Sequence, residues 1–350
     1  MADERTRDVS LVCTMLNEVN SVNDLMQSIA AQTVRPREVI IVDGGSRDGT
    51  QLHIEWWHGR LGCPLRRIEL TGASIATGRN AGIAAARFPV IAITDAGVRL
   101  DARWLEQIIA PFADETVSVS AGFFVADPHT LFEVAMGATT LPHVDEINPA
   151  RFLPSSRSVA VRKTAWAHVG GYPEWLDYCE DVVFDLALGE AHLRVAFVPD
   201  AIARFRPRAT MGAFWHQYFR YARGDGKAGL WPMRHAIRYA AYGCLLGLML
   251  QGKRGRPAWP LVIVGAALSL RCPYARLTPM LHPLPTAKRA EAIALVPLIR
   301  AVGDAAKMCG YPVGVVWQLR HHGFGWTRRD TTVVRSDAST SINGVLPSHT

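Results

Sequence analysis

The sequence lacks several features that would place it in a simple class. Its six cysteines show no CxxC spacing, which argues against a zinc site or a disulfide framework and favours reduced thiols. No basic-then-apolar leader opens the chain, so we expect the first domain to stay in the cytosol. No apolar run reaches the about 20 residues of a full membrane span. At 350 residues and 49% apolar content the chain can still bury a sizeable core, and its slightly positive mean hydropathy favours membrane contact.

Acidic residues are scarce in one segment. Residues 204–256 hold eleven Lys or Arg and one acidic residue, Asp225, so the net charge of +7 is concentrated there. Aromatic residues are interleaved with these cations, a composition typical of a nucleic-acid or a membrane interface. The apolar runs that follow favour membrane lipids as partners and argue against nucleic acid.

The stretch EVIIVDGGSRDGT, residues 38–50, organises the first half of the chain. Residues 39–42 are apolar and mostly β-branched, which predicts a strand buried on both faces of a parallel sheet. Asp43 ends this strand, and two glycines follow that let the backbone turn sharply beside a ligand. Ligands of open α/β sheets bind beyond the strand ends, so Asp43 could accept N–H or hydroxyl donors of a nucleotide. The alternative interpretation is an Asx-type turn between a strand and a helix.

Another predicted strand, residues 89–93, also leads to a carboxylate, Asp95. Two such strand ends favour one shared ligand site over two unrelated turns. An Ala-rich helix predicted at residues 74–87 carries Arg79 and Asn80, which could face an anionic group near these ends. Residues 9–15 predict a further buried strand.

A late acidic pair lies in GGYPEWLDYCEDVVFDLAL. The apolar spacing predicts a helix over about residues 176–188, with Glu180 and Asp181 near its start. Carboxylates at that position are stabilised by the helix dipole by about 0.3–1 kcal/mol. A purely structural role is therefore the alternative to a catalytic one.

Taken together, the motifs resemble the family-two inverting glycosyltransferases with the GT-A nucleotide-sugar fold. The resemblance covers about residues 8–225 and rests on VSLVCTMLNE, EVIIVDGGSRDGT, ATGRNAGI, ITDAGVRLDARWL, GGYPEWLDYCEDVVFDL and QYFRYARGDG. It implies an α/β fold with a mixed, mostly parallel sheet flanked by helices, followed here by C-terminal membrane-associated helices. It also implies a nucleoside-diphosphate sugar as donor.

The resemblance assigns expected roles to particular residues. Asp43 would bond the nucleobase, Arg79 would lie near the base or phosphates, and Asp95 would hold the ribose or a divalent ion. Asp181, with Glu180 beside it, would be the general base that deprotonates the acceptor hydroxyl. The remaining residues expected in the site are Asn17, Glu18 and Asn80 for the nucleotide sugar, and Gln217, Arg220 and Tyr221 for the acceptor.

Two positions depart from the family pattern. Tyr221 replaces the tryptophan of the QxxRW motif of membrane polysaccharide synthases, which weakens the stacking surface. The DxD metal motif is Asp95-Ala96-Gly97 here, without its second carboxylate. Mg²⁺ or Mn²⁺ held by Asp95, the two phosphates and waters remains feasible, and Arg157 or Arg204 could share the charge neutralisation.

Four segments are expected along the chain. Residues 1–228 would form the GT-A domain, 229–275 an apolar helical hairpin, 276–326 amphipathic helices broken near residues 310–312, and 327–350 a disordered tail. The two apolar runs of the hairpin have twelve residues each, so it could span the bilayer, enter it shallowly, lie at its interface, or pack as soluble core helices.

These observations favour an inverting glycosyltransferase at the cell membrane, with its catalytic domain on the cytoplasmic side. It would move a single sugar to a lipid-linked or other membrane-proximal glycan acceptor. So few apolar runs cannot easily form a channel, which ranks this function above a processive polysaccharide synthase. The incomplete DxD leaves an inactive nucleotide-sugar-binding or membrane scaffold protein as a third alternative.

Overall fold

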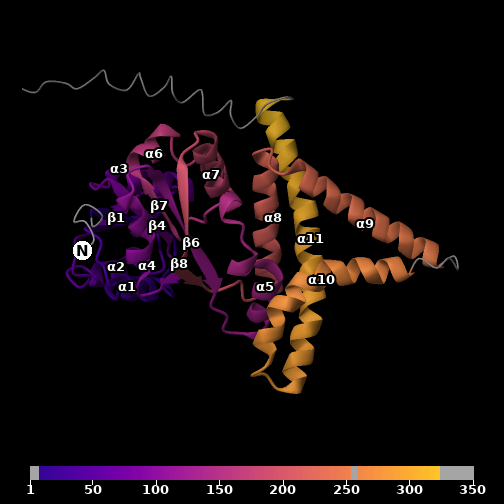
Figure 1. Ribbon diagram of the computed structural model, residues 1–350. Coiled ribbons are helices and arrows are strands. Elements are labelled where there is room, and N and C mark those ends of the chain that lie inside the picture. Colours follow the sequence, from indigo (N-terminus) through magenta and orange to yellow (C-terminus); the bar gives the residue numbers. More distant parts are fainter. Residues whose placement is uncertain (1–7, 254–258, 324–350) are drawn as a thin grey trace, which may run out of the picture. The chain divides into compact units, whose positions relative to one another are not determined.

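The computed structural model describes residues 8–253 and 259–323 (Figure 1). The described chain divides into two compact units, one formed by residues 8–124, 152–203 and 319–323, the other by residues 125–151 and 204–318. The second unit thus includes segments that lie before the sequence-based boundary at residue 228. The expected disordered tail, residues 327–350, lies outside the described residues.

An eight-stranded sheet forms the centre of the first unit, in the order β3-β2-β1-β4-β7-β6-β8-β5. Neighbours among β1 to β4 pair in parallel, whereas β7 pairs antiparallel with β4 and with β6. The expectation of a mixed, mostly parallel sheet is confirmed. The strands are β1 (Val9–Met15), β2 (Glu38–Asp43), β3 (Leu65–Glu69), β4 (Val90–Asp95), β5 (Val98–Leu100), β6 (Val117–Ala126), β7 (Val159–Arg162) and β8 (Arg194–Phe205).

Helices cover both faces of this sheet (Figure 1). The core on one face joins apolar residues of β1, β2, β4 and β7 to α3 and α7, and includes Val12, Ile93 and Phe184. Because β1, β2 and β4 are buried on both sides, their central residues are mostly apolar. The helices of this unit are α1 (Val22–Ala30), α2 (Thr50–Trp56), α3 (Ile75–Ala85), α4 (Trp104–Ile109), α6 (Lys163–His168) and α7 (Glu180–Glu190).

The second unit is helical and consists of α5 (Leu131–Thr140), α8 (Met211–Lys227), α9 (Pro232–Lys253), α10 (Trp259–Leu281) and α11 (Thr286–His322). The expected break near residues 310–312 is wrong, because α11 runs through Pro312 without interruption. Close packing against α8 explains this. A Cβ added at Gly310 would meet the Phe219 carbonyl, and one at Gly314 would meet the Arg223 carbonyl. Tertiary packing of two backbones therefore outweighs the helix-breaking tendency of the glycine and proline.

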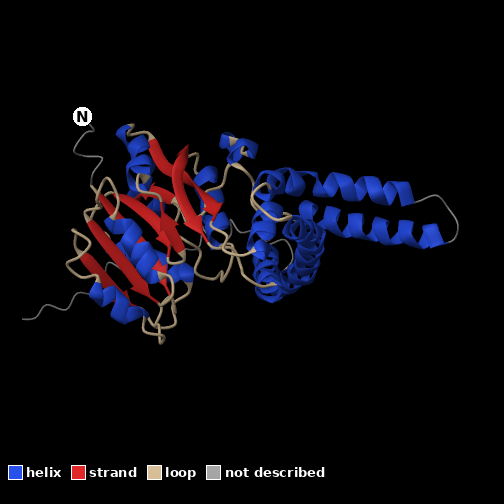
Figure 2. Ribbon diagram, turned by 90° about the horizontal axis from the view of Figure 1, so that it is seen from below, coloured by secondary structure: helices blue, strands red, loops and turns tan. Residues whose placement is uncertain are grey.

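Helix α9 and the first part of α10 form a hairpin that projects from the rest of the second unit (Figure 2). Large apolar side chains on it are exposed, among them Leu246 at 60%, Ile263 at 66% and Leu268 at 69%. Within the described residues, Pro260–Leu281 is the one stretch long and apolar enough to cross a bilayer, and 11% of it is buried. Length and composition of this kind are weak evidence for a membrane span.

Candidate active site

The carboxyl ends of β2 and β4 place Asp43 and Asp95 at the same edge of the sheet. Strand β1 lies between them, with Met15 in register with Asp43 and Thr14 in register with Asp95. Two strand spacings separate the two acidic residues, a distance of about 10 Å. The sequence-based expectation that both acids follow buried strands agrees with this geometry.

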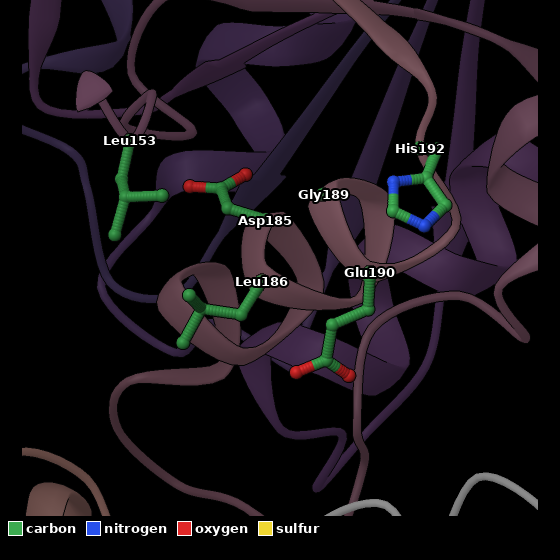
Figure 3. A pocket seen from close by; sticks show the side chains of 6 residues that line it. All are labelled: Leu153, Asp185, Leu186, Gly189, Glu190 and His192. Carbon is green, nitrogen blue, oxygen red and sulfur yellow. The ribbon is translucent and has the colours of Figure 1, made fainter. Parts of the chain in front are cut away.

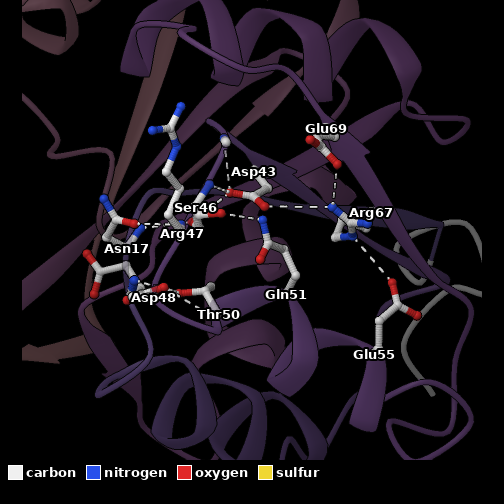
Figure 4. A network of polar contacts seen from close by, with 12 residues as sticks. Asn17, Asp43, Ser46, Arg47, Asp48, Thr50, Gln51, Glu55, Arg67 and Glu69 are labelled. Atoms are coloured by element: carbon white, nitrogen blue, oxygen red, sulfur yellow. Dashed lines mark hydrogen bonds and ion pairs between the residues drawn. The ribbon is translucent and has the colours of Figure 1, made fainter.

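Asp43 is completely buried, and its two carboxylate oxygens differ in their partners (Figure 4). Oδ1 accepts hydrogen bonds from the backbone N–H of Gly45 at 3.2 Å and of Ser46 at 2.9 Å, and from the Ser46 hydroxyl at 2.7 Å. Oδ2 has no hydrogen-bond partner, and Arg67 Nη1 stands 3.7 Å from it. A rigid carboxylate with one unused oxygen is suited to accept a donor group of a ligand.

Asn17 and Glu18 connect the loop after β1 to the loop after β2. Asn17 adopts a positive φ of 57°, its N–H donates to the Ser46 hydroxyl at 2.9 Å, and its Oδ1 accepts from the Arg47 N–H at 2.9 Å. The Glu18 N–H donates to Thr50 Oγ1 at 2.8 Å, while its carboxylate accepts the Ser21 hydroxyl. These contacts fix the shape of the loops that surround Asp43.

Glycines bring α3 unusually close to the sheet. A Cβ at Gly78 would stand 2.9 Å from Thr14 Cγ2, and one at Gly82 would stand 2.5 Å from Val12 Cγ1. Both glycines therefore face β1, which explains their spacing of one helical turn. This close approach brings the side chain between them in the sequence, Arg79, to the strand ends.

Arg79 joins two acidic residues from distant parts of the chain. Its Nη2 donates to Asp95 Oδ1 at 2.7 Å and its Nη1 donates to Glu180 Oε1 at 2.6 Å. The guanidinium is 2% exposed and lies 5.3 Å from the centre of the Tyr172 ring. The structure thus brings three of the predicted site residues into direct contact, from β4, α3 and α7.

The charges of these groups change one another's acidity. Burial raises the pKa of Asp95, but the positive charges of Arg79 and Arg157 outweigh burial, and the net pKa lies below its ordinary value. Burial and the negative charge of Asp181 raise the pKa of Glu180 to about 7, although Arg79 opposes them. Asp95 is therefore held ionised, which suits a residue that binds cations or hydroxyl donors.

Asp181 is the second residue of α7. The residue before this helix, Cys179, has a positive φ of 65°, an unfavourable conformation for a residue with a side chain. This turn lets Glu180 reach Arg79, while Asp181 Oδ1 accepts from the N–H of Val182 at 2.9 Å. The charge of Asp181 also acts on Arg79, so both acids of the pair lie at the same centre.

Asp185 is a buried acid that the sequence analysis missed. It lies one turn after Asp181 on α7, is 8% exposed, and its Oδ2 has no hydrogen-bond partner. Burial and the charge of Asp181 raise its pKa well above the ordinary value. The spacing of four residues from Asp181 was the available signal, since residues four apart share a helix face.

A groove of about 690 Å³ lies beside α7 (Figure 3). Asp185 and Leu186 line it together with Glu190, so three α7 side chains contribute to its wall. The groove opens next to a buried carboxylate whose Oδ2 has no hydrogen-bond partner, which gives the first unit space for a polar ligand. The other lining residues are Leu153, Gly189 and His192.

Both ends of the Asn80 side-chain amide form hydrogen bonds within the first unit. Its Nδ2 donates to the Tyr172 carbonyl and to Glu174 Oε1, both at 2.8 Å. Its Oδ1 accepts from Trp166 Nε1 at 3.0 Å and from the Tyr172 N–H at 2.9 Å. Because both ends of the amide are used, Asn80 fixes α3 against the segment that precedes α7.

The predicted acceptor residues Gln217, Arg220 and Tyr221 belong to α8 in the second unit. Gln217 Nε2 donates to the Tyr221 hydroxyl at 2.7 Å, and Gln217 Oε1 is buried without a hydrogen-bond partner. The first unit holds the other predicted residues: Asn17, Glu18, Asp43, Arg79, Asn80, Asp95, Glu180 and Asp181.

The strand ends offer few protein side chains as ligands for a divalent cation. Among residues 8–253 and 259–323, no group of three or more His, Cys, Asp or Glu side chains could hold a metal. Asp95, 24% exposed, is the carboxylate that the strand end presents. A single carboxylate fits Mg²⁺ or Mn²⁺ when substrate phosphates and waters supply the other ligands.

The fold is that of a GT-A domain. A mannosyltransferase from Pyrobaculum calidifontis, solved in complex with GDP-Man and Mn²⁺, superposes with a TM-score of 0.54 at 19% identity. The alignment covers 89% of this chain and 87% of that one. The likeness concerns the fold alone.

In sequence comparison, residues 10–168, less than half of the chain, match Glycosyl transferase family 2. This match agrees with the resemblance stated from the motifs. The pre-mycofactocin glycosyltransferase of Mycobacterium tuberculosis is 25% identical over 288 residues, 75% of this chain and 54% of that protein. The succinoglycan biosynthesis protein ExoA of Rhizobium meliloti is 28% identical over 273 residues, 71% of this chain and 81% of that protein. The chain thus spans about half the length of the mycobacterial relative.

Proposed function

We propose that this protein is an inverting glycosyltransferase that moves one sugar from a nucleoside-diphosphate sugar to a lipid-linked or other membrane-proximal acceptor. The observation that carries the proposal is the Arg79 bridge between Asp95 and Glu180. It links the strand end where a donor would bind to the acidic start of α7. The match of residues 10–168 to Glycosyl transferase family 2 supports the same function.

The donor nucleotide would bind across the ends of β2 and β4. Asp43 Oδ2, buried without a partner, would accept an N–H of the nucleobase. Asp95 would bind the ribose or a cation, and the loops fixed by Asn17 and Glu18 would close around the base. Burial of Asp43 strengthens such a bond, because water competes poorly there.

The transfer itself needs a base on the side opposite the leaving group. Asp181 would take the proton of the acceptor hydroxyl as that oxygen bonds to the anomeric carbon of the sugar. The bond from this carbon to the diphosphate oxygen breaks at the same time, and the nucleoside diphosphate leaves with the electron pair. Glu180, held by Arg79, would position Asp181 by fixing the first turn of α7.

A divalent cation, Mg²⁺ or Mn²⁺, would be held by Asp95. When bound, such an ion supplies positive charge to the departing diphosphate. Arg157 acts electrostatically on Asp95 and would contribute charge at the same place. The solved mannosyltransferase of the same fold contains Mn²⁺ with its nucleotide sugar, which supports this part of the proposal.

Acceptor binding is assigned to Gln217, Arg220 and Tyr221 on α8. The partnerless Gln217 Oε1 supports this assignment, since it could accept a hydroxyl of a glycan. The exposed apolar hairpin of α9 and α10 supports a location at the cell membrane. The catalytic unit would lie on the cytoplasmic side.

A donor screen tests the proposal. Purified protein is incubated with UDP-, GDP- and dTDP-sugars and either ion, and nucleoside diphosphate release is measured with and without membrane lipid extract. Lipid-dependent release from one donor class is expected. Binding of a nucleotide sugar without any turnover would instead favour an inactive binding protein, and release of pyrophosphate would indicate a nucleotidyltransferase.

A further inference from the structure

A cluster of basic side chains surrounds one buried carboxylate in the second unit. Asp304 on α11 is 6% exposed, and its oxygens accept from Arg238 Nε at 3.0 Å and from the Tyr242 hydroxyl at 3.2 Å. Arg300 Nε lies 3.2 Å and Lys307 Nζ 3.9 Å from the same carboxylate. We call Arg234, Arg238, Arg300 and Lys307 the cation cluster.

Positive charge is in excess within this cluster. Burial lowers the pKa of Lys307 to about 8, Asp304 opposes the change, and the charges of Arg238, Arg234 and Arg300 add to it. The three arginines are therefore close enough to repel the lysine, and one carboxylate pairs with three cations, Arg238, Arg300 and Lys307. The next carboxylate along, Asp225, is engaged with His235 Nε2 at 3.1 Å. Surplus charge in a half-buried position is suited to an anion.

The cation cluster is accessible from outside the second unit. The Arg300 side chain is 43% exposed and that of Lys307 is 23% exposed, whereas Asp304 is enclosed. Both can therefore turn toward an incoming anion without breaking the buried contact of Arg238 with Asp304.

Exposed apolar side chains lie on α9 next to two of these cations. Met233 and Ile237 on α9 directly precede Arg234 and Arg238, and they are 70% and 61% exposed. Cations beside exposed apolar side chains match the headgroup region of a bilayer, where phosphates lie next to acyl chains. A free phosphate would leave these apolar side chains in water.

We propose that the cation cluster binds the phosphate of a lipid. Arg300 and Lys307 would reach the phosphate oxygens, Arg234 would add charge at the rim, and the apolar side chains would contact the lipid chains. The phosphate could belong to an anionic headgroup or to a lipid-linked acceptor. The second source rests on the proposed function, whereas binding itself does not depend on any transfer activity.

Vesicle binding without donor sugar tests this proposal separately from the transferase function. The full chain is sedimented with vesicles of phosphatidylcholine alone, with added phosphatidylglycerol, or with a small fraction of a polyprenyl phosphate. The variants are Arg300→Gln and Lys307→Gln. The matched control is Lys288→Gln, which removes a 56% exposed charge from the same helix, where Lys288 pairs with Glu291 at 2.7 Å.

Each cluster variant should bind phosphate-bearing vesicles about fivefold more weakly, the effect of one cation near a lipid surface. Lys288→Gln should match the wild type, and Arg300→Lys should retain binding. A loss only with phosphatidylglycerol would identify a headgroup, and a loss only with the polyprenyl phosphate would identify the acceptor. Equal binding by wild type and cluster variants, or an equal loss with Lys288→Gln, would overturn the proposal. Unchanged thermal unfolding shows that the variants are folded.

Discussion

Arg79 donates from one nitrogen to Asp95 and from the other to Glu180, so one guanidinium connects β4 to the first turn of α7. Removing it by Arg79→Met leaves two carboxylates facing each other in a buried place. We expect a loss of about 3–5 kcal/mol in the free energy of unfolding, measured by urea denaturation. Arg37→Met is the control, because Arg37 pairs with Asp8 at the surface with 52% of its side chain exposed. An equal, small effect of both variants would contradict a structural role for the bridge.

Asp43→Asn should weaken nucleotide binding with little change in the loop. Oδ1 can keep its three hydrogen bonds, whereas an amide nitrogen in place of Oδ2 cannot accept a nucleobase N–H. Loss of one bond to a charged group predicts about 10- to 150-fold weaker binding of the preferred nucleoside diphosphate by calorimetry. Asp48→Asn is the control in the same loop, since both its oxygens already accept local bonds. Unchanged affinity for Asp43→Asn would exclude Asp43 from the base site.

Asp181→Asn should lower turnover by roughly two to four orders of magnitude while nucleotide binding stays nearly intact. The substitution removes a proton acceptor and keeps the shape of the side chain. Initial rates and nucleotide affinity are measured on the same preparation. Asp24→Asn, which alters an exposed acid in the first turn of α1, is the matched control and should remain active. Normal turnover of Asp181→Asn would refute its role as base.

Glu180 should make stability depend on pH in a defined direction. Its pKa rises from 4.5 to about 7 on folding, so the folded state binds the proton more tightly than the unfolded chain. The free energy of unfolding of the wild type, relative to Glu180→Gln, should therefore fall as the pH rises from about 4.5 to about 7. Urea titrations across this range measure the difference. Arg103 lowers the pKa of Glu106, so the corresponding difference for Glu106→Gln should rise with pH below about 4.5 and stay level between about 4.5 and 7. A rising difference for Glu180 would reject the assignment.

The exposed hairpin should determine membrane association. Ile263→Asp with Leu268→Asp places two charges on the outer side of α10, and we expect the protein to move from the membrane fraction to the soluble fraction. Leu52→Asp alters an equally exposed leucine, 75% exposed, on α2 of the first unit and should leave the distribution unchanged. Unaltered sedimentation of the hairpin variant would defeat the anchor proposal.

The sequence was sufficient to locate the strand ends. Asp43 and Asp95 follow continuous apolar runs, and a run of that kind indicates a parallel strand whatever its neighbours are. The hydrogen bond from Arg79 to Glu180 was harder to predict from the sequence, because it depends on the loop before α7. In that loop Cys179 adopts a positive φ, which its residue type disfavours. Asp185 was overlooked because a buried acid on an amphipathic helix has no distinct pattern of its own.

The second unit was harder to predict for a different reason. Glycine and proline near residues 310–312 locally disfavour a helix, and only the neighbouring helix α8 shows why α11 continues. Likewise, Arg238 and Asp304 are 66 residues apart, a pairing that no local spacing indicates. The excess of positive charge in residues 204–256 could be counted in the sequence. The sequence did not indicate that cations would gather around one carboxylate, Asp304.

The missing side chains of Gly78 and Gly82 set the height of α3 above β1. A single methyl group at Gly82 would lift the helix and carry the guanidinium at position 79 with it, while every polar group stayed chemically intact. Such a change would separate the donor-side acid from the acceptor-side acids by geometry alone. Under the proposed function, Gly82→Ala should therefore lower turnover more than it weakens donor binding.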